Sequence, residues 1–393
     1  MSRNIIIIGA GASGIFAAIH AAERGAAVTV LEQNSQAGKK ILASGNGRCN
    51  FTNLAPDPGR YRSDDPSLVR SVMRKFTVTD TLSWFRGAGL LYTEKDGWCY
   101  PRTGQAQSVL RVLLLEAERL GVRFKFRESV KAIRKTEEGY CVETGGWQYN
   151  AGRVIVSCGS PASAVEGSSG SAAEFADALG IPAQPFLPAL TGLRGCGSFF
   201  PKWAGIRIHG SASLEADGTI IQTEEGELQL TDYGISGIPV FQISGEAVQH
   251  LSEGAAVRIL LDFCPEETRE SLESELKRRA QRNPGCRPAD ILSGILPERL
   301  IPLFTGDNDL QSSAQLIKQF PVAVRSIPGF RNAQVCSGGI NASGLTENME
   351  SVKMKGLYFT GEAVNCYGPC GGYNLQWAWS SGYAAGCAAA DER

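Results

Sequence analysis

This sequence has few histidines, no Cys-x-x-Cys motif and no recognisable secretory signal. Only three of the 393 residues are histidines, at positions 20, 209 and 250, and none stands in a recognisable catalytic setting. The eleven cysteines are odd in number and include no Cys-x-x-Cys pair. Zinc and iron–sulfur sites use clustered thiolates, so we expect no metal site. An odd cysteine count without a secretory signal favours a reducing compartment, and we expect a cytoplasmic protein.

Strong charge of one sign is also lacking. Lysine and arginine number 39 against 40 acidic residues, the formal net charge is −1, and no basic block appears. Because nucleic-acid-binding surfaces are usually basic, the sequence predicts no nucleic-acid partner. Residues 5–22 contain no Asp, Glu, Lys or Arg, but Gly9, Gly11, Ser13, Gly14 and His20 interrupt this run. We therefore expect neither a membrane span nor a signal peptide.

Glycine is in excess, with 46 of 393 residues, against a usual share of roughly 7%. The first cluster follows four isoleucines that predict a short buried strand. It reads Gly9-x-Gly11-x-x-Gly14, and an alanine-rich helix is expected to follow as far as about Glu23. A second strand is expected from Ala27 to Leu31. Strand, glycines, helix and strand in this order predict a dinucleotide-binding unit.

The residue types at this turn match the needs of a bound dinucleotide. Gly9 allows the tight turn, Gly11 lets a pyrophosphate approach the backbone, and Gly14 lets helix and strand pack closely. The start of the helix offers unpaired N–H groups to the phosphates. Glu32 follows the second strand and can accept hydrogen bonds from a ribose, which favours FAD or NAD over NADP.

The segment ILASGNGRCN, residues 41–50, comes soon after this acid. Lys39, Lys40 and Arg48 can offset phosphate charge, and the glycines at 45 and 47 can form a backbone nest for an anion. A solvated surface turn is the alternative interpretation of the same residues.

Four stretches together resemble a known family: GAGASG, GKKILASGNGRCNFTN, GLYFTGEAV and GGYNLQWAWSSGYAAG. They are similar to the bacterial HI0933-like flavoproteins, NAD(P)/FAD-dependent oxidoreductases whose relatives include aminoacetone-oxidase-like and bile-acid-reductase-like proteins. The resemblance covers essentially the whole chain. It implies an α/β fold in which a Rossmann-like FAD-binding domain is interrupted by an insert.

The pattern within the chain agrees with an insert. Residues 207–244 alternate apolar and polar side chains between glycine turns, which predicts antiparallel strands, and residues 265–320 read as several helices. We expect an antiparallel β subdomain with a helical cap that shapes a substrate pocket. The expected division is 1–189 for the first part of the FAD-binding domain, 190–333 for the insert and 334–393 for the second part.

The resemblance extends the set of expected cofactor contacts beyond the first turn. Val130, on an expected strand spanning 121–133, is either an adenine contact or sheet core. Glu362 would bind the ribityl chain, and a helix starting near Asn374 would point its N-terminus at the flavin pyrimidine, or be an ordinary helix start. Cys49 is better explained as a buried, inert thiol. The expected cofactor-binding residues are Gly9, Gly11, Ala12, Ser13, Gly14, Glu32, Gln33, Lys40, Ser44, Gly45, Gly47, Arg48, Cys49, Asn50, Val130, Gly159, Gly361, Glu362, Gly372, Asn374 and Leu375.

Catalytic residues are harder to identify. Asp232 stands where the family motif has histidine, and Cys366 and Cys370 could form a redox pair beside the flavin or could be packing thiols. These three are the weak catalytic candidates.

The predicted function is an FAD-dependent oxidoreductase that exchanges a hydride between flavin N5 and a small organic substrate. The chain has no second GxGxxG, so NADH or NADPH, if used, would be a transient co-substrate at the same flavin. The subtype is an NAD(P)H-linked reductase or an amine-type oxidase. A flavin-binding sensor or scaffold without turnover is the alternative, and an enzyme that modifies RNA is disfavoured by the even charge balance. The sequence leaves the substrate and the oligomeric state open.

Overall fold

The structure is a computed structural model that describes residues 4–305 and 309–391. It divides into two compact units. Unit 1 holds the residues up to 187 together with those from 335 onward, and unit 2 holds residues 188–334. The boundaries expected from the sequence lie at 189/190 and 333/334, within two residues of these.

A five-stranded parallel sheet forms the centre of unit 1, in the order β20-β11-β1-β2-β7. The first strand, β1, pairs with β2 on one side and with β11 on the other, with Ile8 opposite Leu31 and Val156. Its isoleucines are almost completely inaccessible to solvent, as expected for a sheet covered on both faces. The strands are β1 (Asn4–Ile8), β2 (Ala27–Glu32), β7 (Arg123–Phe126), β11 (Arg153–Val156) and β20 (Leu357–Phe359). The predicted α/β Rossmann-like fold is confirmed.

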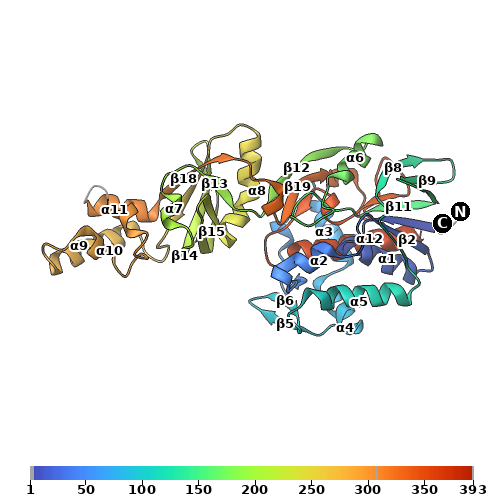
Figure 1. Ribbon diagram of the computed structural model, residues 1–393, viewed down its shortest axis with the longest axis horizontal. Helices are drawn as coiled ribbons and strands as arrows, with labels where there is room; N and C mark the ends of the chain where they lie inside the picture. Colours follow the sequence, from blue (N-terminus) through green and yellow to red (C-terminus); the bar gives the residue numbers. More distant parts are fainter. Residues whose placement is uncertain (1–3, 306–308, 392–393) are drawn as a thin grey trace. The chain divides into compact units, whose positions relative to one another are not determined.

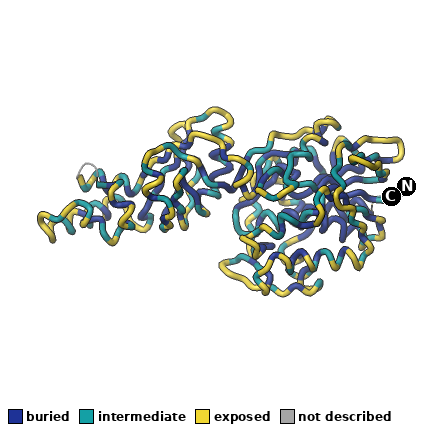
Figure 2. Tube along the Cα trace, viewed as in Figure 1, coloured by how far each residue is buried: buried dark blue, intermediate teal, exposed yellow. Residues whose placement is uncertain are grey.

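Two helices from opposite ends of the chain lie side by side in unit 1, α1 (Ala12–Glu23) and α12 (Tyr373–Asp391) (Figure 1). Small residues allow this approach. A Cβ atom added at Gly382 would lie 2.6 Å from the Ser13 carbonyl oxygen, and one at Gly386 would lie 2.4 Å from that of Ala17. The buried residues of the unit concentrate around this helix pair and the parallel sheet (Figure 2).

The other elements of unit 1 form small sheets and surface helices. The small sheets are β3-β6-β5, β10-β9-β8, β21-β4 and β12-β19. Their strands are β3 (Thr52–Asn53), β4 (Arg62–Ser63), β5 (Tyr92–Lys95), β6 (Trp98–Pro101), β8 (Val130–Lys135), β9 (Tyr140–Thr144), β10 (Gln148–Ala151), β12 (Ala183–Ala189), β19 (Val335–Ile340) and β21 (Cys366–Tyr367). The helices are α2 (Lys39–Ala43), η1 (Ser44–Gly47), η2 (Pro58–Arg60), α3 (Pro66–Lys75), α4 (Val78–Gly87), α5 (Ala106–Arg119), α6 (Ser171–Ala178), η5 (Ala342–Gly344) and η6 (Gly361–Ala363).

The single strand expected over 121–133 is wrong. Arg127 adopts a positive φ of 61° and turns the chain, so that β7 joins the parallel sheet while β8 joins an antiparallel one. The pattern of apolar and polar residues does not change at Arg127, so the sequence gives no sign that the strand ends there.

A closed barrel forms the body of unit 2, in the order β13-β16-β15-β14-β17-β18. All its pairs are antiparallel, which confirms the expected β subdomain. The strands are β13 (Leu193–Gly195), β14 (Arg207–Ala216), β15 (Thr219–Leu230), β16 (Gly234–Gly237), β17 (Val257–Asp262) and β18 (Phe320–Ser326). The helices are α7 (Phe200–Trp203), α8 (Ile238–Ser252), α9 (Arg269–Arg282), α10 (Pro288–Leu292), η3 (Ile301–Leu303), α11 (Leu310–Lys318) and η4 (Phe330–Asn332).

One part of the expected strand pattern in unit 2 is wrong, because residues 238–244 belong to helix α8. Gly237 has a φ of 100°, which turns the chain out of β16, and Pro239 occupies the first helical turn, where a missing N–H costs nothing. Within unit 2, α9, α10 and α11 lie at the end of the barrel away from α8 (Figure 1). In the parts of the chain described, no helix combines the length and apolar character needed to cross a bilayer.

Candidate cofactor-binding site

The turn between β1 and α1 is tightly closed on its protein side and open at Gly11. A Cβ atom added at Gly14 would lie 2.0 Å from the Gly9 carbonyl oxygen, so the close approach requires glycine. At Gly11 an added Cβ would meet nothing within 4 Å, and no side chain caps the helix there. Space is therefore left beside the first N–H groups of α1, including those of Ala12 and Ser13, where a phosphate can bind.

Glu32, at the end of β2, is buried and held firmly. Its Oε2 accepts a hydrogen bond of 2.9 Å from the Ala10 N–H, and its Oε1 accepts from both the backbone N–H and the side-chain Nδ2 of Asn34, each at 2.8 Å. The carboxylate is therefore fixed beside the glycine turn. The sequence analysis did not identify Asn34, although an amide two residues after Glu32 could have been expected to bind its carboxylate. Gln33 is exposed and donates to the Gly167 carbonyl at 2.6 Å.

Three segments meet at a cluster of polar groups beyond this turn. Lys40 Nζ lies 3.0 Å from Glu362 Oε2 and 3.0 Å from the Ser160 carbonyl oxygen. The Ser160 hydroxyl donates to the same Glu362 oxygen at 2.8 Å. Gly159 adjoins the cluster, since a Cβ added there would lie 3.9 Å from Lys40 Nζ. Lys40, predicted to offset phosphate charge, and Glu362, predicted to bind the ribityl chain, therefore form an ion pair with each other.

The loop after β20 lies against the start of α1. A Cβ added at Gly361 would lie 2.5 Å from Ser13 Oγ. The Gly361 N–H donates to Ser381 Oγ at 3.0 Å, and its carbonyl accepts from Trp377 Nε1 at 3.0 Å, so α12 holds both backbone groups. The C-terminal segment is thereby placed next to the N-terminal turn.

Residues 44–50 form a loop with several left-handed residues. Gly45, Asn46, Gly47 and Cys49 all have positive φ, between 54° and 81°. Exposed Arg48 places its guanidinium 5.4 Å from the centre of the Tyr100 ring. The loop starts at Ser44, whose hydroxyl donates to the Ile41 carbonyl at 2.6 Å.

Cys49 is completely buried, and burial raises the pKa of its thiol to about 11. A thiol of this pKa stays protonated at neutral pH, which fits a packing role.

The strand that follows this loop is attached to α12 by buried hydrogen bonds. Gln376 is fully buried, and its Oε1 accepts from the hydroxyls of Thr52 at 2.6 Å and Thr81 at 3.0 Å. Trp379 Nε1 donates to the Phe51 carbonyl at 2.8 Å, and Asn53 Nδ2 donates to the Gly371 carbonyl at 2.9 Å. The central residue of this network, Gln376, was missed by the sequence analysis, because its role depends on partners about 300 residues away.

The turn before α12 fits closely against the same strand. Gly372 has a φ of 88°, and an added Cβ would lie 2.4 Å from the Thr52 carbonyl carbon. Asn374 is occupied by the preceding loop, since its Oδ1 accepts from the Gly368 N–H at 2.8 Å and its Nδ2 donates to the Gly368 carbonyl at 2.9 Å. Leu375 is partly buried against the core of unit 1.

Asn50 differs from its neighbours because both polar atoms of its side chain are buried without a hydrogen-bond partner among the described residues. A Cβ added at Gly372 would lie 2.9 Å from Asn50 Oδ1, so this amide adjoins the turn before α12.

Two of the remaining candidates belong to other elements. Val130 starts β8, in a sheet separate from the parallel one, although the Glu128 N–H two residues earlier donates to the Glu32 carbonyl at 2.9 Å. Asp232 is exposed, on the turn between β15 and β16 in unit 2.

The two cysteines proposed as a redox pair are thiols, and no disulfide joins them. Cys366 is buried in β21, which pairs with β4. Burial raises the pKa of the Cys370 thiol to about 12 and that of Cys366 well above its ordinary value. A reactive thiolate needs a lowered pKa, so the environment of both residues opposes a redox role. In the described ranges, no group of three or more His, Cys, Asp or Glu side chains is arranged to hold a metal ion.

Comparison with known proteins places the chain in a family. The family model described as "HI0933-like protein Rossmann domain" matches residues 3–388. The chain is 38% identical to a 3-dehydro-bile acid delta(4,6)-reductase of Clostridium scindens over 99% of both chains. It is 30% identical to a ribosomal RNA dihydrouridine synthase of Haemophilus influenzae over 96% of both.

Among solved structures, a 3-ketosteroid-delta4-(5alpha)-dehydrogenase of Rhodococcus jostii RHA1 resembles the chain with a TM-score of 0.51. The alignment covers 99% of this chain and 96% of that one. At 18% identity this likeness concerns the fold alone.

These relatives correct one expectation. From the even charge balance we expected no nucleic-acid partner. That argument is wrong, because a relative that aligns over 96% of both chains is named for its action on ribosomal RNA. A net charge near zero describes the whole chain and says little about one site. The match over residues 3–388 and the 38% identical relative show that the chain belongs to the HI0933-like family of Rossmann-domain flavoprotein oxidoreductases.

Proposed function

We propose that this chain is an FAD-dependent reductase that acts on a carbon–carbon double bond conjugated to a carbonyl group in a small organic substrate. The observation that carries the proposal is that unit 1 contains an open helix start at Gly11 beside a fixed acid at Glu32, and an unpartnered amide at Asn50 beside the turn before α12. One elongated ligand with phosphates, a ribose and a polar ring system would use all three.

The residues present fit FAD. The pyrophosphate would take the N–H groups at the start of α1, and the adenosine ribose would bind Glu32, which Asn34 already orients. Lys40 and Glu362 would exchange part of their mutual ion pair for phosphate and ribityl hydroxyls respectively. When bound, the flavin supplies hydride chemistry at N5, and the protein supplies its position and the charges around it.

The substrate class follows from what the relatives are named for. The bile-acid relative is named as a delta(4,6)-reductase of a 3-dehydro compound, which is a ketone conjugated to double bonds. Dihydrouridine differs from uridine by reduction of a ring double bond that is conjugated to a carbonyl. Both names describe the same chemical change, and the identity of 38% over the whole chain favours the small, steroid-like substrate. NADH or NADPH would reduce the flavin between turnovers.

The test is anaerobic reduction and reoxidation of the purified holoprotein, followed by flavin absorbance. We expect NADH or NADPH to bleach the flavin, and a 3-oxo-4,6-diene steroid acid to restore its colour while one of its two carbon–carbon double bonds is reduced for each flavin reoxidised. A protein that binds FAD but shows no turnover with either donor would instead support the sensor or scaffold alternative. A protein that retains no FAD would overturn the proposal.

A second candidate function is reduction of a uridine in RNA, favoured by the 30% identical relative of 96% coverage. The same experiment separates the two, with a ribosomal RNA fragment and the steroid acid offered as competing oxidants. Reoxidation by the RNA alone, with dihydrouridine in its nucleoside digest, would replace the first proposal by the second.

A further inference from the structure

The side-chain amide of Asn50 is a buried polar group that the protein itself does not satisfy. Neither Nδ2 nor Oδ1 makes a hydrogen bond within the described residues, and both atoms are enclosed. Two other amides of the adjoining segments are engaged, since Asn53 donates to Gly371 and Asn374 bonds with Gly368 in both directions. A buried donor and acceptor that make no hydrogen bonds lower the stability of the fold, so such a group calls for an explanation.

The backbone around Asn50 gives its side chain little freedom to relax. The Cys49 N–H donates to the Ser44 carbonyl at 3.0 Å, and the Phe51 N–H donates to the Cys99 carbonyl at 3.0 Å. On the other side, Trp379 and Gln376 hold the backbone of Phe51 and the hydroxyl of Thr52. The backbone that carries this amide is therefore fixed on both sides before any ligand arrives, which limits where the side chain can lie.

The chemistry of the missing partner can be deduced from the amide. A phosphate oxygen accepts hydrogen bonds only, so it could satisfy Nδ2 but would leave Oδ1 without a donor. A ligand that satisfies both atoms must present an acceptor beside a donor. The pyrimidine ring of the isoalloxazine has this arrangement, because its N3–H lies between two carbonyl groups.

We infer that the Asn50 carboxamide pairs with the pyrimidine edge of the isoalloxazine, donating from Nδ2 to a ring carbonyl and accepting from N3–H at Oδ1. This inference rests on the proposed binding of FAD. Adenine also presents a donor beside an acceptor, but the acid suited to the adenosine ribose, Glu32, ends β2, whereas Asn50 adjoins Gly372 and the start of α12. The donated hydrogen bond stabilises the electron density that the ring gains on reduction, so Asn50 raises the reduction potential of the flavin.

The experiment compares three variants of the full chain with the wild type. Asn50→Leu removes both hydrogen bonds and keeps the number of side-chain heavy atoms, and Asn50→Asp keeps the shape but replaces the donor by an acceptor that can be charged. Asn150→Asp makes the same chemical change at an exposed position on β10 of the same unit. For each protein we would measure the dissociation constant of FAD, the midpoint potential of the bound flavin and the melting temperature of the apoprotein.

We expect Asn50→Leu to bind FAD about tenfold to a hundredfold more weakly, as the loss of two hydrogen bonds implies. Its apoprotein should melt at the same or a higher temperature, because an unsatisfied amide has been removed. Asn50→Asp should shift the midpoint potential to a more negative value, and Asn150→Asp should match the wild type. A residue with a merely structural role would lower apoprotein stability and leave the potential unchanged.

The outcomes distinguish this inference from the proposed function. If the wild type binds no FAD, the proposed function fails. If the wild type binds FAD and both Asn50 variants keep its affinity and potential, the assignment of Asn50 to the flavin edge is overturned. A change confined to the KM of the organic substrate would likewise overturn it, by assigning the amide to the substrate. Should Asn50→Asp fail to fold, the opposite movements of FAD affinity and apoprotein stability in Asn50→Leu still decide the question.

Discussion

The two glycine-containing turns that open α1 and α12 are assembled in opposite ways. At α1, the contact that requires glycine joins Gly14 to Gly9, five positions apart in the sequence. At α12, Gly372 fits against Thr52, and the hydrogen bonds that fix this approach join residues 318 and 324 positions apart. The start of α1 is specified by its own local sequence, whereas the start of α12 depends on contacts with residues near the other end of the chain.

The difference extends to how polar groups are satisfied. Beside the first turn, Glu32 has partners for both carboxylate oxygens, contributed within the β1–β2 region. Beside the second turn, the Gln376 amide is satisfied by distant hydroxyls while the Asn50 amide is left unpartnered. Local assembly gives a turn whose polar groups are satisfied by near neighbours, whereas the distant assembly leaves one buried amide without a partner among the described residues.

The largest expected effect would break the first turn. Gly14→Ala should lower the free energy of unfolding by about 3 kcal/mol, because its Cβ would overlap the Gly9 carbonyl. The matched control, Gly11→Ala, meets no atom and should cost no more than about 1 kcal/mol, the usual effect of alanine at a helix N-cap, while weakening FAD binding by intruding on the phosphate position. Urea unfolding of the apoproteins and FAD titration measure both. Equal stability of the two variants would contradict this account of the turn.

An intermediate effect should come from the network that assembles the second turn. Gln376→Leu leaves the buried hydroxyl of Thr52 without its acceptor, whereas that of Thr81 keeps the Thr77 carbonyl at 3.1 Å, and the change should cost about 2 kcal/mol of unfolding free energy. Adding Thr52→Val should cost less in that background than alone, with a coupling of about 1 kcal/mol in a double-mutant cycle. Gln148→Leu, on exposed β10, serves as the control and should be nearly neutral. Strict additivity would mean that the network does not tie β3 to α12.

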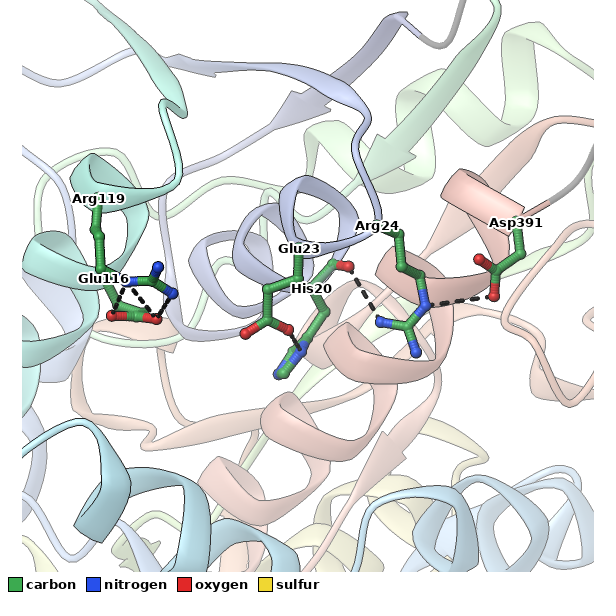
Figure 3. Close-up of polar contacts among 6 residues, drawn as sticks. All are labelled: His20, Glu23, Arg24, Glu116, Arg119 and Asp391. Carbon is green, nitrogen blue, oxygen red and sulfur yellow. Dashed lines mark hydrogen bonds and ion pairs between the residues drawn. The ribbon is translucent and has the colours of Figure 1, made fainter.

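The smallest effect concerns the far end of α1, where His20 Nδ1 lies 2.6 Å from Glu23 Oε2 (Figure 3). The hydrogen bond from His20, aided by the charges of His20, Arg24 and Arg119, lowers the pKa of Glu23 below its ordinary value of 4.5, against the opposing effect of burial. Because the folded-state pKa is the lower one, this contribution to stability is present above pH 4.5 and is lost as the pH falls further towards the folded-state value.

Glu23→Gln should therefore flatten the acid limb of the pH–stability curve by about 0.5 kcal/mol, a small value because the side chain is partly exposed. Glu118→Gln, exposed on α5, is the control. Chemical unfolding between pH 3 and 6 measures the slope. An unchanged acid limb in Glu23→Gln would show that the pair does not affect stability.

Prediction from sequence succeeded where local pattern dictates structure. The isoleucine strand, the glycine turn and the alanine-rich helix were all predicted, because burial on both faces and close backbone contacts restrict which residues are possible there. It failed at Arg127 and at 238–244. One residue with positive φ in the first case, and a glycine with a proline two positions later in the second, redirected a segment whose side-chain pattern suited a strand. Gln376 could not be identified in advance, since nothing near it in the sequence shows that its amide will be buried.

The sequence by itself determined the β1–α1–β2 unit with its glycine turn, because this unit depends on residues that lie close together in the chain. It also determined the family, because the motifs of the family can be read directly. Only the tertiary structure decided that residues 50–53 lie against the start of α12, that Lys40 faces Glu362, and that Asn50 is enclosed without a partner. The physical reason is the distance along the chain. Hydrogen bonds between residues about 320 positions apart form only after the whole of unit 1 has folded around them.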